Sequence, residues 1–251
     1  MTQVSVITIV KDHEIGLKKT YVSLLSQSLL DWEMIIVVAD SNDETLTLAR
    51  ALQSGDSRIH LVRQEGLGIY EAMNEGLGLA TGIYTWFMNA GDKFASGVIL
   101  EKGVNEIRKG DFGLVIGSHQ LQGCAREFSN KYRTRNLTAV NFSFNRGGGC
   151  HQAMIFRTDI LKKIGGFNVS YSLASDFDLV IRVLKISQGS RVLEIYADIE
   201  PGGIADQKIY QVHCEKHQIR RSLLGGALIF IASLVWTTLA RAKLAFRSII
   251  N

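Results

Sequence analysis

The sequence predicts an α/β fold in which helices flank a mostly parallel sheet. Continuous runs of β-branched and aliphatic residues, such as VSVITIV at residues 4–10, are typical of strands buried on both faces of a parallel sheet. These runs alternate with segments of helical spacing, which is the pattern of right-handed βαβ crossovers. The composition agrees, because 46% hydrophobic and 21% charged residues allow a sizeable core and exclude a disordered chain.

Strands are expected where apolar residues run together. In chain order these are residues 4–10, 33–39, 58–62, 83–88, 114–117 and 153–156. Tight turns between the elements are expected at glycines, because the chain has 24 of them and a single proline.

Helices are expected where apolar residues recur every three or four positions. In chain order these are residues 17–30, 43–53 and 175–186, with a short helix in the stretch that follows Gly68. Ser175 is expected to cap the last of these helices, and Asp178, three residues on, completes a capping-box pattern.

Length, charge and cysteine content bound the class of protein. The 251 residues have room for one large domain, expected over residues 1–205, and a C-terminal segment over residues 206–251. The net charge of +4 is mild and no basic run interleaves with aromatic residues, so nucleic acid is not expected as a partner. Three cysteines without a CxxC pair favour a reduced, cytosolic setting. No charged region precedes the first strand, so no signal peptide is expected.

The most informative stretch runs from Gly66 to Asp92. It reads GLGIYEAMNEG, then ATG, then FMNAGD, which predicts a glycine-hinged loop, a short helix, a buried strand and a small-residue turn with one carboxylate. The acid therefore follows the carboxyl end of a strand, where open α/β sheets bind their ligands. A dinucleotide-dependent dehydrogenase is excluded, because no G-x-G-x-x-G follows the first strand.

This stretch resembles the sugar-nucleotide domain of family 2 glycosyltransferases, which have the GT-A fold. The resemblance is to the branch that makes colanic acid, exopolysaccharides and O-antigens. It implies an inverting enzyme that moves one sugar from a nucleotide-sugar donor to a lipid-linked or oligosaccharide acceptor in bacterial surface polysaccharide biosynthesis. The Q-x-x-R-W signature of processive synthases is absent, so non-processive transfer is expected.

Asp92 is the expected metal ligand. By the resemblance, the D-x-D motif of the family falls on Asn89, Ala90 and Gly91, so only Asp92, the next residue, keeps a charge. A divalent cation, Mg²⁺ or Mn²⁺, would neutralise the charge that develops on a nucleoside diphosphate as it leaves. The alternative is that Gly91 and Asp92 only form a turn.

Asp176 is the expected catalytic base. The segment YSLASDFDL at residues 171–179 resembles the family segment that carries the base, with Asp176 on the position of its aspartate. An inverting transferase needs one carboxylate to take the proton of the acceptor hydroxyl. Asp178 lies roughly 200° further round the helix and cannot face the same site. The opposing interpretation is that Asp176 is a surface anion whose low pKa, set by the helix dipole, makes it a poor base.

Six residues are expected in the nucleotide and donor site by the same resemblance: Thr8, Asp40, Gly66, Gly68, Asn74 and Asn89. The acids that usually contact the nucleotide fall on Val38 and Ala39, so Asp40 is expected to replace them. The glycines would let backbone N–H groups approach a phosphate, and the alternative for them is a flexible turn before a helix. For residues 40–43 the alternative is a turn and a helix N-cap.

Three histidines complete the candidates. His151 and Gln152 match a His-Gln pair that lines the acceptor pocket in similar enzymes, and the glycines at 147–149 favour a mobile loop before them. The alternative for His151 is a histidine satisfied within the core. His213 and His217 have a spacing that can bind zinc on a helix, but no further ligand is near, so a solvated or diphosphate-facing helix is preferred.

The uncharged, apolar segment at residues 222–240 predicts a C-terminal apolar helix. It would extend roughly 28 Å, close to the thickness of a hydrocarbon core. Three arrangements stay open: a helix in the plane of the membrane or re-entrant, a helix packed on the domain or on the partner of a homodimer, and a membrane span. The first fits a lipid-linked acceptor and predicts a cytoplasmic protein, peripheral at the inner face of the bacterial inner membrane.

A second class of function also stays open. The alternative is a non-catalytic sugar-nucleotide-binding or scaffolding subunit, because Asn89 and Gly91 replace acids of the D-x-D motif and Val38 and Ala39 replace the acids that usually contact the nucleotide. Catalysis is preferred because Asp92, Asp176 and the pair at 151–152 are all present, and catalytic groups act as units.

Overall fold

We describe the protein from a computed structural model. The structure describes residues 2–123, 127–128, 133–144, 150–203 and 207–225, together with Val235 and Thr238. The glycines at 147–149, and the apolar segment expected at 222–240 apart from its first four residues and two isolated positions, lie outside the described residues.

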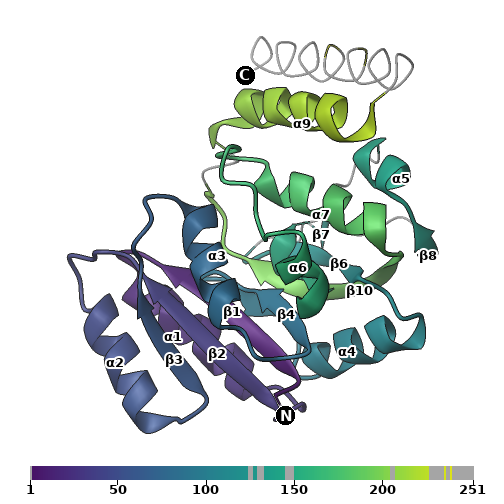
Figure 1. Ribbon diagram of the computed structural model, residues 1–251. Helices are drawn as coiled ribbons and strands as arrows, with labels where there is room; N and C mark the ends of the chain where they lie inside the picture. Colours follow the sequence, from purple (N-terminus) through teal and green to yellow (C-terminus); the bar gives the residue numbers. More distant parts are fainter. Residues whose placement is uncertain are drawn as a thin grey trace.

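One mixed sheet organises the domain (Figure 1), and its strands follow the order β3-β2-β1-β4-β9-β6-β10-β5. In chain order the strands are β1 (Val4–Val10), β2 (Trp32–Val38), β3 (Ile59–Arg63), β4 (Tyr84–Phe87), β5 (Lys93–Phe94), β6 (Leu114–Leu121), β7 (Glu127–Phe128), β8 (Thr134–Leu137), β9 (Met154–Arg157) and β10 (Gly189–Ile199). Strands β7 and β8 pair with β6 and β10, beside the main path.

Parallel pairing joins β3, β2, β1 and β4, as expected for the amino-terminal half. Beyond β4 the sheet is mixed, because β9 is antiparallel to both of its neighbours, β4 and β6. The sequence predicts a strand at residues 153–156 but not this orientation, since an apolar run reads the same for either direction.

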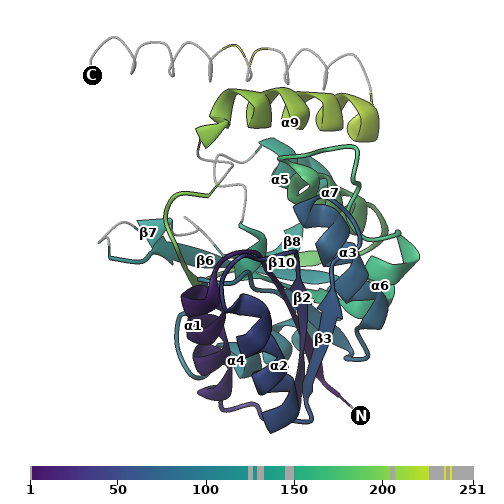
Figure 2. The same cartoon turned by 90° about the vertical axis from the view of Figure 1, so that its left-hand side faces the viewer.

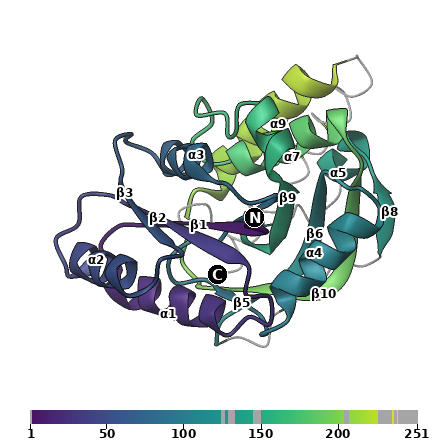
Figure 3. The same cartoon turned by 60° about the horizontal axis from the view of Figure 1, so that its bottom comes forward.

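Helices cover both faces of the sheet (Figures 2 and 3). They are α1 (Glu14–Leu25), α2 (Thr45–Gly55), α3 (Ile69–Leu79), α4 (Ile99–Lys109), α5 (Ala139–Phe144), α6 (Thr158–Lys163), α7 (Ser175–Ile186) and α9 (Ile209–Leu224), with a 3-10 turn at His151–Ala153. One core lies between the sheet and α1, α2 and α4, and a second lies between the sheet and α3, α5, α6, α7 and α9. The predicted α/β fold with a sheet flanked by helices is therefore confirmed.

Helix α1 begins three residues before the expected helix at 17–30 and ends five residues before its end. Side chains from the start of α2 explain the early start, because Thr45 and Asp43 accept hydrogen bonds from the backbone N–H groups of His13 and Glu14, at 3.0 and 3.2 Å. These contacts join residues about thirty positions apart, so periodicity within the helix could not reveal them.

The expected capping box at the start of α7 is wrong. The N-cap residue is Ala174, and no side chain of the helix caps it. The Ser175 hydroxyl instead donates to the carbonyl of Asn168 at 2.8 Å. The Asp178 carboxylate pairs with Arg182 one turn later, at 2.6 Å. Both side chains thus make structural contacts of their own, whereas Asp176 accepts the backbone N–H of Phe177 at Oδ1, at 2.7 Å, and keeps Oδ2 for contacts outside the helix.

Glu33 explains why the turn before β4 reads Ala-Thr-Gly. Its buried carboxylate accepts hydrogen bonds from the Ser5 hydroxyl at 2.6 Å, the Thr81 backbone N–H at 2.7 Å and the Thr81 hydroxyl at 2.9 Å. Gly82 has no room for a side chain, because a Cβ there would lie 2.6 Å from the backbone nitrogen of Ser5. The acid therefore ties β1 and β2 to the turn that delivers β4 and the residues after it.

Helix α9 packs on the domain. Ile219 is fully buried in the core beside α7, and the Arg220 guanidinium donates to the carbonyl of Ser143 at 2.8 Å. Among the residues that the structure describes, no helix is both long enough and apolar enough to cross a membrane.

Candidate active site

A cleft of about 510 Å³ opens at the carboxyl edge of the parallel half of the sheet. The ends of β1 and β2, the loop before α3 and the residue after β4 line it: Ile9, Val10, Lys11, Ala39, Asp40, Gln64, Glu65, Gly66, Leu67, Gly68, Ile69 and Asn89. Strands β2 and β3 lie on one side of β1, and β4 lies on the other side. The strand order therefore reverses at β1, which is the switch point at which such sheets bind ligands. The structure thus brings four predicted donor residues together, Asp40, Gly66, Gly68 and Asn89.

The glycines of the donor loop pack closely against Glu71 of α3, whose Cβ leaves no room for a side chain at Gly66. A Cβ at Gly66 would lie 2.6 Å from the Cβ of Glu71, and one at Gly68 would lie 2.0 Å from a carboxylate oxygen of Glu71. The Gly66 N–H donates to Glu75 at 2.7 Å, and Gln64 donates to the carbonyls of Gly66 and Gly68 at 2.7 and 3.0 Å. The loop is therefore held in shape by its own side chains, and its walls are acidic.

Two predicted donor residues lie outside this cleft. Thr8 is fully buried. It shares one face of β1 with Val6 and Val10, and this face packs against α1. Asn74 uses both ends of its amide on the backbone of Phe167, with hydrogen bonds of 2.9 and 2.7 Å. Asn74 therefore joins α3 to the loop after α6, a structural contact that its place in the sequence stretch does not reveal.

Asp92 is 4% exposed, and hydrogen-bond donors occupy both of its carboxylate oxygens. The Gln152 amide donates to Oδ2 at 2.8 Å, and the Glu200 backbone N–H donates to Oδ1 at 2.8 Å. Burial raises the pKa of Asp92 above its ordinary value, against the opposing effect of these hydrogen bonds. Gln152, predicted on the acceptor side, thus holds the acid that was expected to bind the metal.

The described side chains do not fit a divalent cation held by the protein. No three histidine, cysteine, aspartate or glutamate side chains gather into a metal-binding group in the described part of the chain. The oxygens of Asp92 face N–H donors, and a hard cation needs several free oxygens. The zinc alternative for His213 and His217 likewise finds no such group among the described residues.

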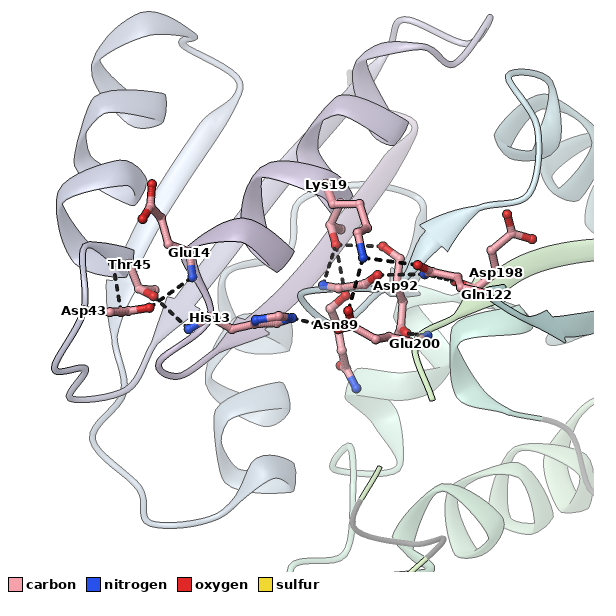
Figure 4. Close-up of polar contacts among 12 residues, drawn as sticks. His13, Glu14, Lys19, Asp43, Thr45, Asn89, Asp92, Gln122, Asp198 and Glu200 are labelled. Carbon is pink, nitrogen blue, oxygen red and sulfur yellow. Dashed lines mark hydrogen bonds and ion pairs between the residues drawn. The ribbon is translucent and has the colours of Figure 1, made fainter. Parts of the chain in front are cut away.

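Sequence reasoning missed a polar cluster beside Asp92, formed by His13, Lys19 and Glu200 (Figure 4). One oxygen of Glu200 lies 2.7 Å from His13 Nε2, and the other lies 3.1 Å from Lys19 Nζ. Burial would raise the pKa of Glu200, but the hydrogen bonds from His13 and Lys19 outweigh it and hold the pKa below its ordinary value. No motif surrounds Glu200, which follows β10 and meets His13 across 187 positions of the chain.

Gly91 makes room for this cluster. Its φ is +98°, and a Cβ there would lie 2.1 Å from Glu200 Oε2 and 2.9 Å from His13 Nε2. The Thr20 hydroxyl accepts the Gly91 N–H at 3.1 Å, and Gln122 donates to the Gly91 carbonyl at 2.8 Å. Glycine is thus needed at this position by conformation and by space.

A line of polar contacts leads from the cleft to Asp176. The Asn89 amide nitrogen lies 3.2 Å from His151 Nε2, and His151 Nδ1 lies 3.8 Å from Asp176 Oδ2. An amide nitrogen only donates, so Nε2 accepts and the ring proton sits on Nδ1, where it faces the carboxylate. If the Asn89 amide were reversed, its oxygen would accept a proton on Nε2, and the lone pair of Nδ1 would face the negative carboxylate, which is unfavourable. The Asn89 Oδ1 atom is buried and has no hydrogen-bond partner among the described residues.

Asp176 is half-buried, with a side chain 24% exposed. Burial would raise the pKa of Asp176, but the His151 ring and the charge of Lys216 outweigh it and hold the pKa below its ordinary value. Lys216 comes from α9, which sequence reasoning placed outside the domain. Asp176 is therefore ionised at neutral pH, as a general base must be before it accepts a proton.

Solved structures share this fold. S. aureus TarS 1–349 in complex with UDP matches with a TM-score of 0.73 at 16% identity, over 93% of this chain and 71% of TarS 1–349. The mannosyltransferase PcManGT from Pyrobaculum calidifontis, in complex with GDP-Man and Mn²⁺, matches with a TM-score of 0.70 at 16% identity, over 97% of this chain and 75% of the other. The GT-A fold expected from the sequence is thereby confirmed.

Proteins of similar sequence are also sugar-transferring enzymes by name. A PGL/p-HBAD biosynthesis glycosyltransferase of Mycobacterium bovis (strain BCG / Pasteur 1173P2) is 28% identical over 165 residues, which are 64% of this chain and 61% of that protein. The chain thus spans about three fifths of such relatives. Chondroitin synthase of Escherichia coli is 25% identical over 78% of this chain and 28% of its own length. The sequence model described as "Glycosyl transferase family 2" matches residues 5–165, so the chain belongs to this family.

Proposed function

We propose that the protein is an inverting, non-processive glycosyltransferase that moves one sugar from a nucleotide-sugar donor to a hydroxyl of a lipid-linked saccharide. The proposal rests above all on one arrangement, the line from Asn89 in the cleft through His151 to Asp176. That line joins a cavity of nucleotide size to an ionised carboxylate. Membership of the family and the nucleotides bound by similar structures support the same reaction.

The donor would lie in the cleft with its nucleoside near Asp40 and its diphosphate and sugar near Asn89. The unpartnered Oδ1 of Asn89 would accept a hydrogen bond from a sugar hydroxyl. A buried acceptor without a partner costs free energy, and this hydrogen bond would remove that cost. The acidic walls of the donor loop, with Glu65 facing the cleft and Glu71 and Glu75 behind it, disfavour a bare diphosphate there. We infer that the diphosphate lies near Asn89 and Lys11, which also line the cleft.

In the reaction, the acceptor hydroxyl oxygen attacks the anomeric carbon while Asp176 takes its proton. A new C–O bond forms on one face of the sugar as the C–O bond to the diphosphate breaks on the other, and the diphosphate keeps the electron pair. His151 would hold the Asp176 carboxylate through Nδ1–H before the transfer. As the acceptor covers Asp176, the loss of water would raise the low pKa of the carboxylate and make it a better base.

The remaining features of the function are proposals from the sequence. A lipid-linked acceptor in bacterial surface polysaccharide biosynthesis, a peripheral position at the inner face of the inner membrane through residues 222–240, and a homodimer stay proposals. Chondroitin synthase and the PGL/p-HBAD enzyme both carry names of glycan-building proteins, which supports the polysaccharide context.

The test is radiolabelled-sugar transfer on membranes with a panel of UDP- and GDP-sugars, comparing the parent with Asp176→Asn and Asp40→Asn. We expect Asp176→Asn to lower kcat by about 10²–10⁴-fold, the contribution of a general base. Asp40→Asn, a change of the same chemistry inside the cleft, should raise the donor KM and leave kcat nearly unchanged.

Each other outcome contradicts a part of the proposal. Equal transfer by the parent and Asp176→Asn would mean that another carboxylate is the base. Nucleotide binding without transfer from any donor would favour the non-catalytic, scaffolding function. The divalent metal predicted at Asp92 stays a prediction, which loss of transfer in EDTA and recovery in Mn²⁺ would support and unchanged transfer in EDTA would contradict.

A further inference from the structure

Glu215 of α9 binds the turn that leads into α7. Its Oε1 accepts hydrogen bonds from the backbone N–H and the hydroxyl of Ser172, at 3.1 and 2.9 Å. Its Oε2 accepts the backbone N–H groups of Leu173 and Ala174, at 2.9 and 2.8 Å. One carboxylate thus takes the amide protons of three consecutive residues from 41–43 positions away.

This turn determines where Asp176 lies. Ala174 is the N-cap of α7, and Asp176 is the second residue of the helix. No side chain within α7 caps its start, and the Ser175 hydroxyl is used on Asn168. The backbone N–H groups of Leu173 and Ala174, just before the helix and at its N-cap, are therefore satisfied from α9 by Glu215.

The docking of α9 does not depend on Glu215. Ile219 is fully buried in the core, and Arg220 donates to the carbonyl of Ser143 at 2.8 Å. At the far end of the helix, Lys185 of α7 donates to the carbonyl of Leu223 at 3.0 Å. A carboxylate is consequently not needed to hold the helix in place, and its four hydrogen bonds all act on one turn.

We propose that Glu215 is a positioning residue for catalysis, which fixes the Ser172–Ala174 turn and through it the base Asp176. Helix α9 is then part of the catalytic centre, although it lies beyond the residues 5–165 that match the family. The same helix brings Lys216 to within 5.3 Å of the Phe177 ring, next to Asp176 in the chain. This role rests on the proposed function, since it acts only through Asp176.

The test compares full-length parent, Glu215→Gln, Asp176→Asn and the double variant in the transfer assay, with Lys185→Ala as the matched control on the same helix pair. Glutamine keeps the size of the side chain but places an NH₂ group against N–H donors. We expect kcat to fall about 10- to 100-fold in Glu215→Gln, the cost of a small misplacement at a reacting centre, with the donor KM unchanged. Lys185→Ala should keep kcat within about twofold, as a surface contact would.

Two readouts separate positioning from general stability. If Glu215 acts through Asp176, the double variant should be no slower than Asp176→Asn alone, because the two changes remove the same contribution. Hydrogen exchange at the amides of Leu173 and Ala174 should speed up in Glu215→Gln and stay unchanged in Lys185→Ala.

Three results would overturn the proposal: a parent-like kcat in Glu215→Gln, multiplicative losses in the double variant, or an equal loss of kcat in Lys185→Ala. An Asp176→Asn protein as fast as the parent would instead overturn the proposed base, and this role with it. A slow Asp176→Asn beside a parent-like Glu215→Gln would overturn the role of Glu215 alone.

Discussion

Replacing Gly91 by alanine tests the packing that surrounds Asp92. The residue has a φ of +98°, and a Cβ would lie 2.1 Å from Glu200 Oε2, about an ångström and a half inside normal contact. The Gly91 N–H donates to the Thr20 hydroxyl at 3.1 Å and the Gly91 carbonyl accepts from Gln122 at 2.8 Å, so rotation of the backbone would break both hydrogen bonds. The Glu200 side chain must move instead.

The cost can be worked from these contacts. A non-glycine residue held at this φ costs about 1–3 kcal/mol. Moving Glu200 breaks its half-exposed ion pairs with His13 and Lys19, each worth about 0.2–1 kcal/mol. The free energy of unfolding should therefore fall by about 1.5–5 kcal/mol, or about 3–20 °C in Tm for a chain of this size.

Thermal unfolding and sugar transfer measure this together. Transfer should fall as well, because the strained turn carries Asp92, the residue that follows Gly91. The matched control is Gly78→Ala in α3, where a Cβ meets nothing within 4 Å and φ is not positive, so stability should hold or rise by about 0.5–1 kcal/mol. A Gly91→Ala protein with the Tm and transfer rate of the parent would refute the reasoning.

Two further predictions concern buried polar contacts. Burial would raise the pKa of Glu33, but hydrogen bonds from Ser5 and Thr81 outweigh it and hold the pKa below its ordinary value. Glu33→Gln should therefore cost about 1–3 kcal/mol at neutral pH. In urea titrations, this difference from the parent should shrink as pH falls below about 4.3 and through the lower folded-state pKa, and a constant difference would contradict it. Asn74→Ala should lower the free energy of unfolding by about 1–3 kcal/mol through the lost bonds to Phe167. Nucleotide affinity measured by calorimetry should not change, and a weaker affinity would restore Asn74 to the donor site.

Much of the fold could be predicted because its signals are local. The apolar runs of β1, β2 and β4 and the amphipathic pattern of α7 are each contained in one short stretch of sequence. The antiparallel insertion of β9 and the early start of α1 could not, since both depend on partners far away in the chain. The capping box failed for a more local reason, because the carbonyl of Asn168, seven positions earlier, accepts the Ser175 hydroxyl.

The site divides in the same way. Asp40, Gly66, Gly68 and Asn89 belong to strand ends and loops that the topology must bring to one edge, and the structure places them around one cleft. Glu200 and Glu215 carry no motif, and only the packed chain sets them against Asp92 and the turn before α7. Thr8 and Asn74 sit inside the right stretches but point their polar atoms elsewhere. A stretch of sequence thus predicts the neighbourhood of a residue more reliably than the direction of its side chain.

The long separation between Glu215 and the turn it holds also orders events during synthesis. A ribosome adding about 5–20 residues per second reaches Glu215 roughly 2–8 s after it has added Ala174. The residues that line the cleft, from Ile9 to Asn89, are all made before that interval begins. The contact that holds the base can therefore form only after the helix that carries Glu215 has been made, so the order of synthesis makes it one of the last contacts of the site to be completed.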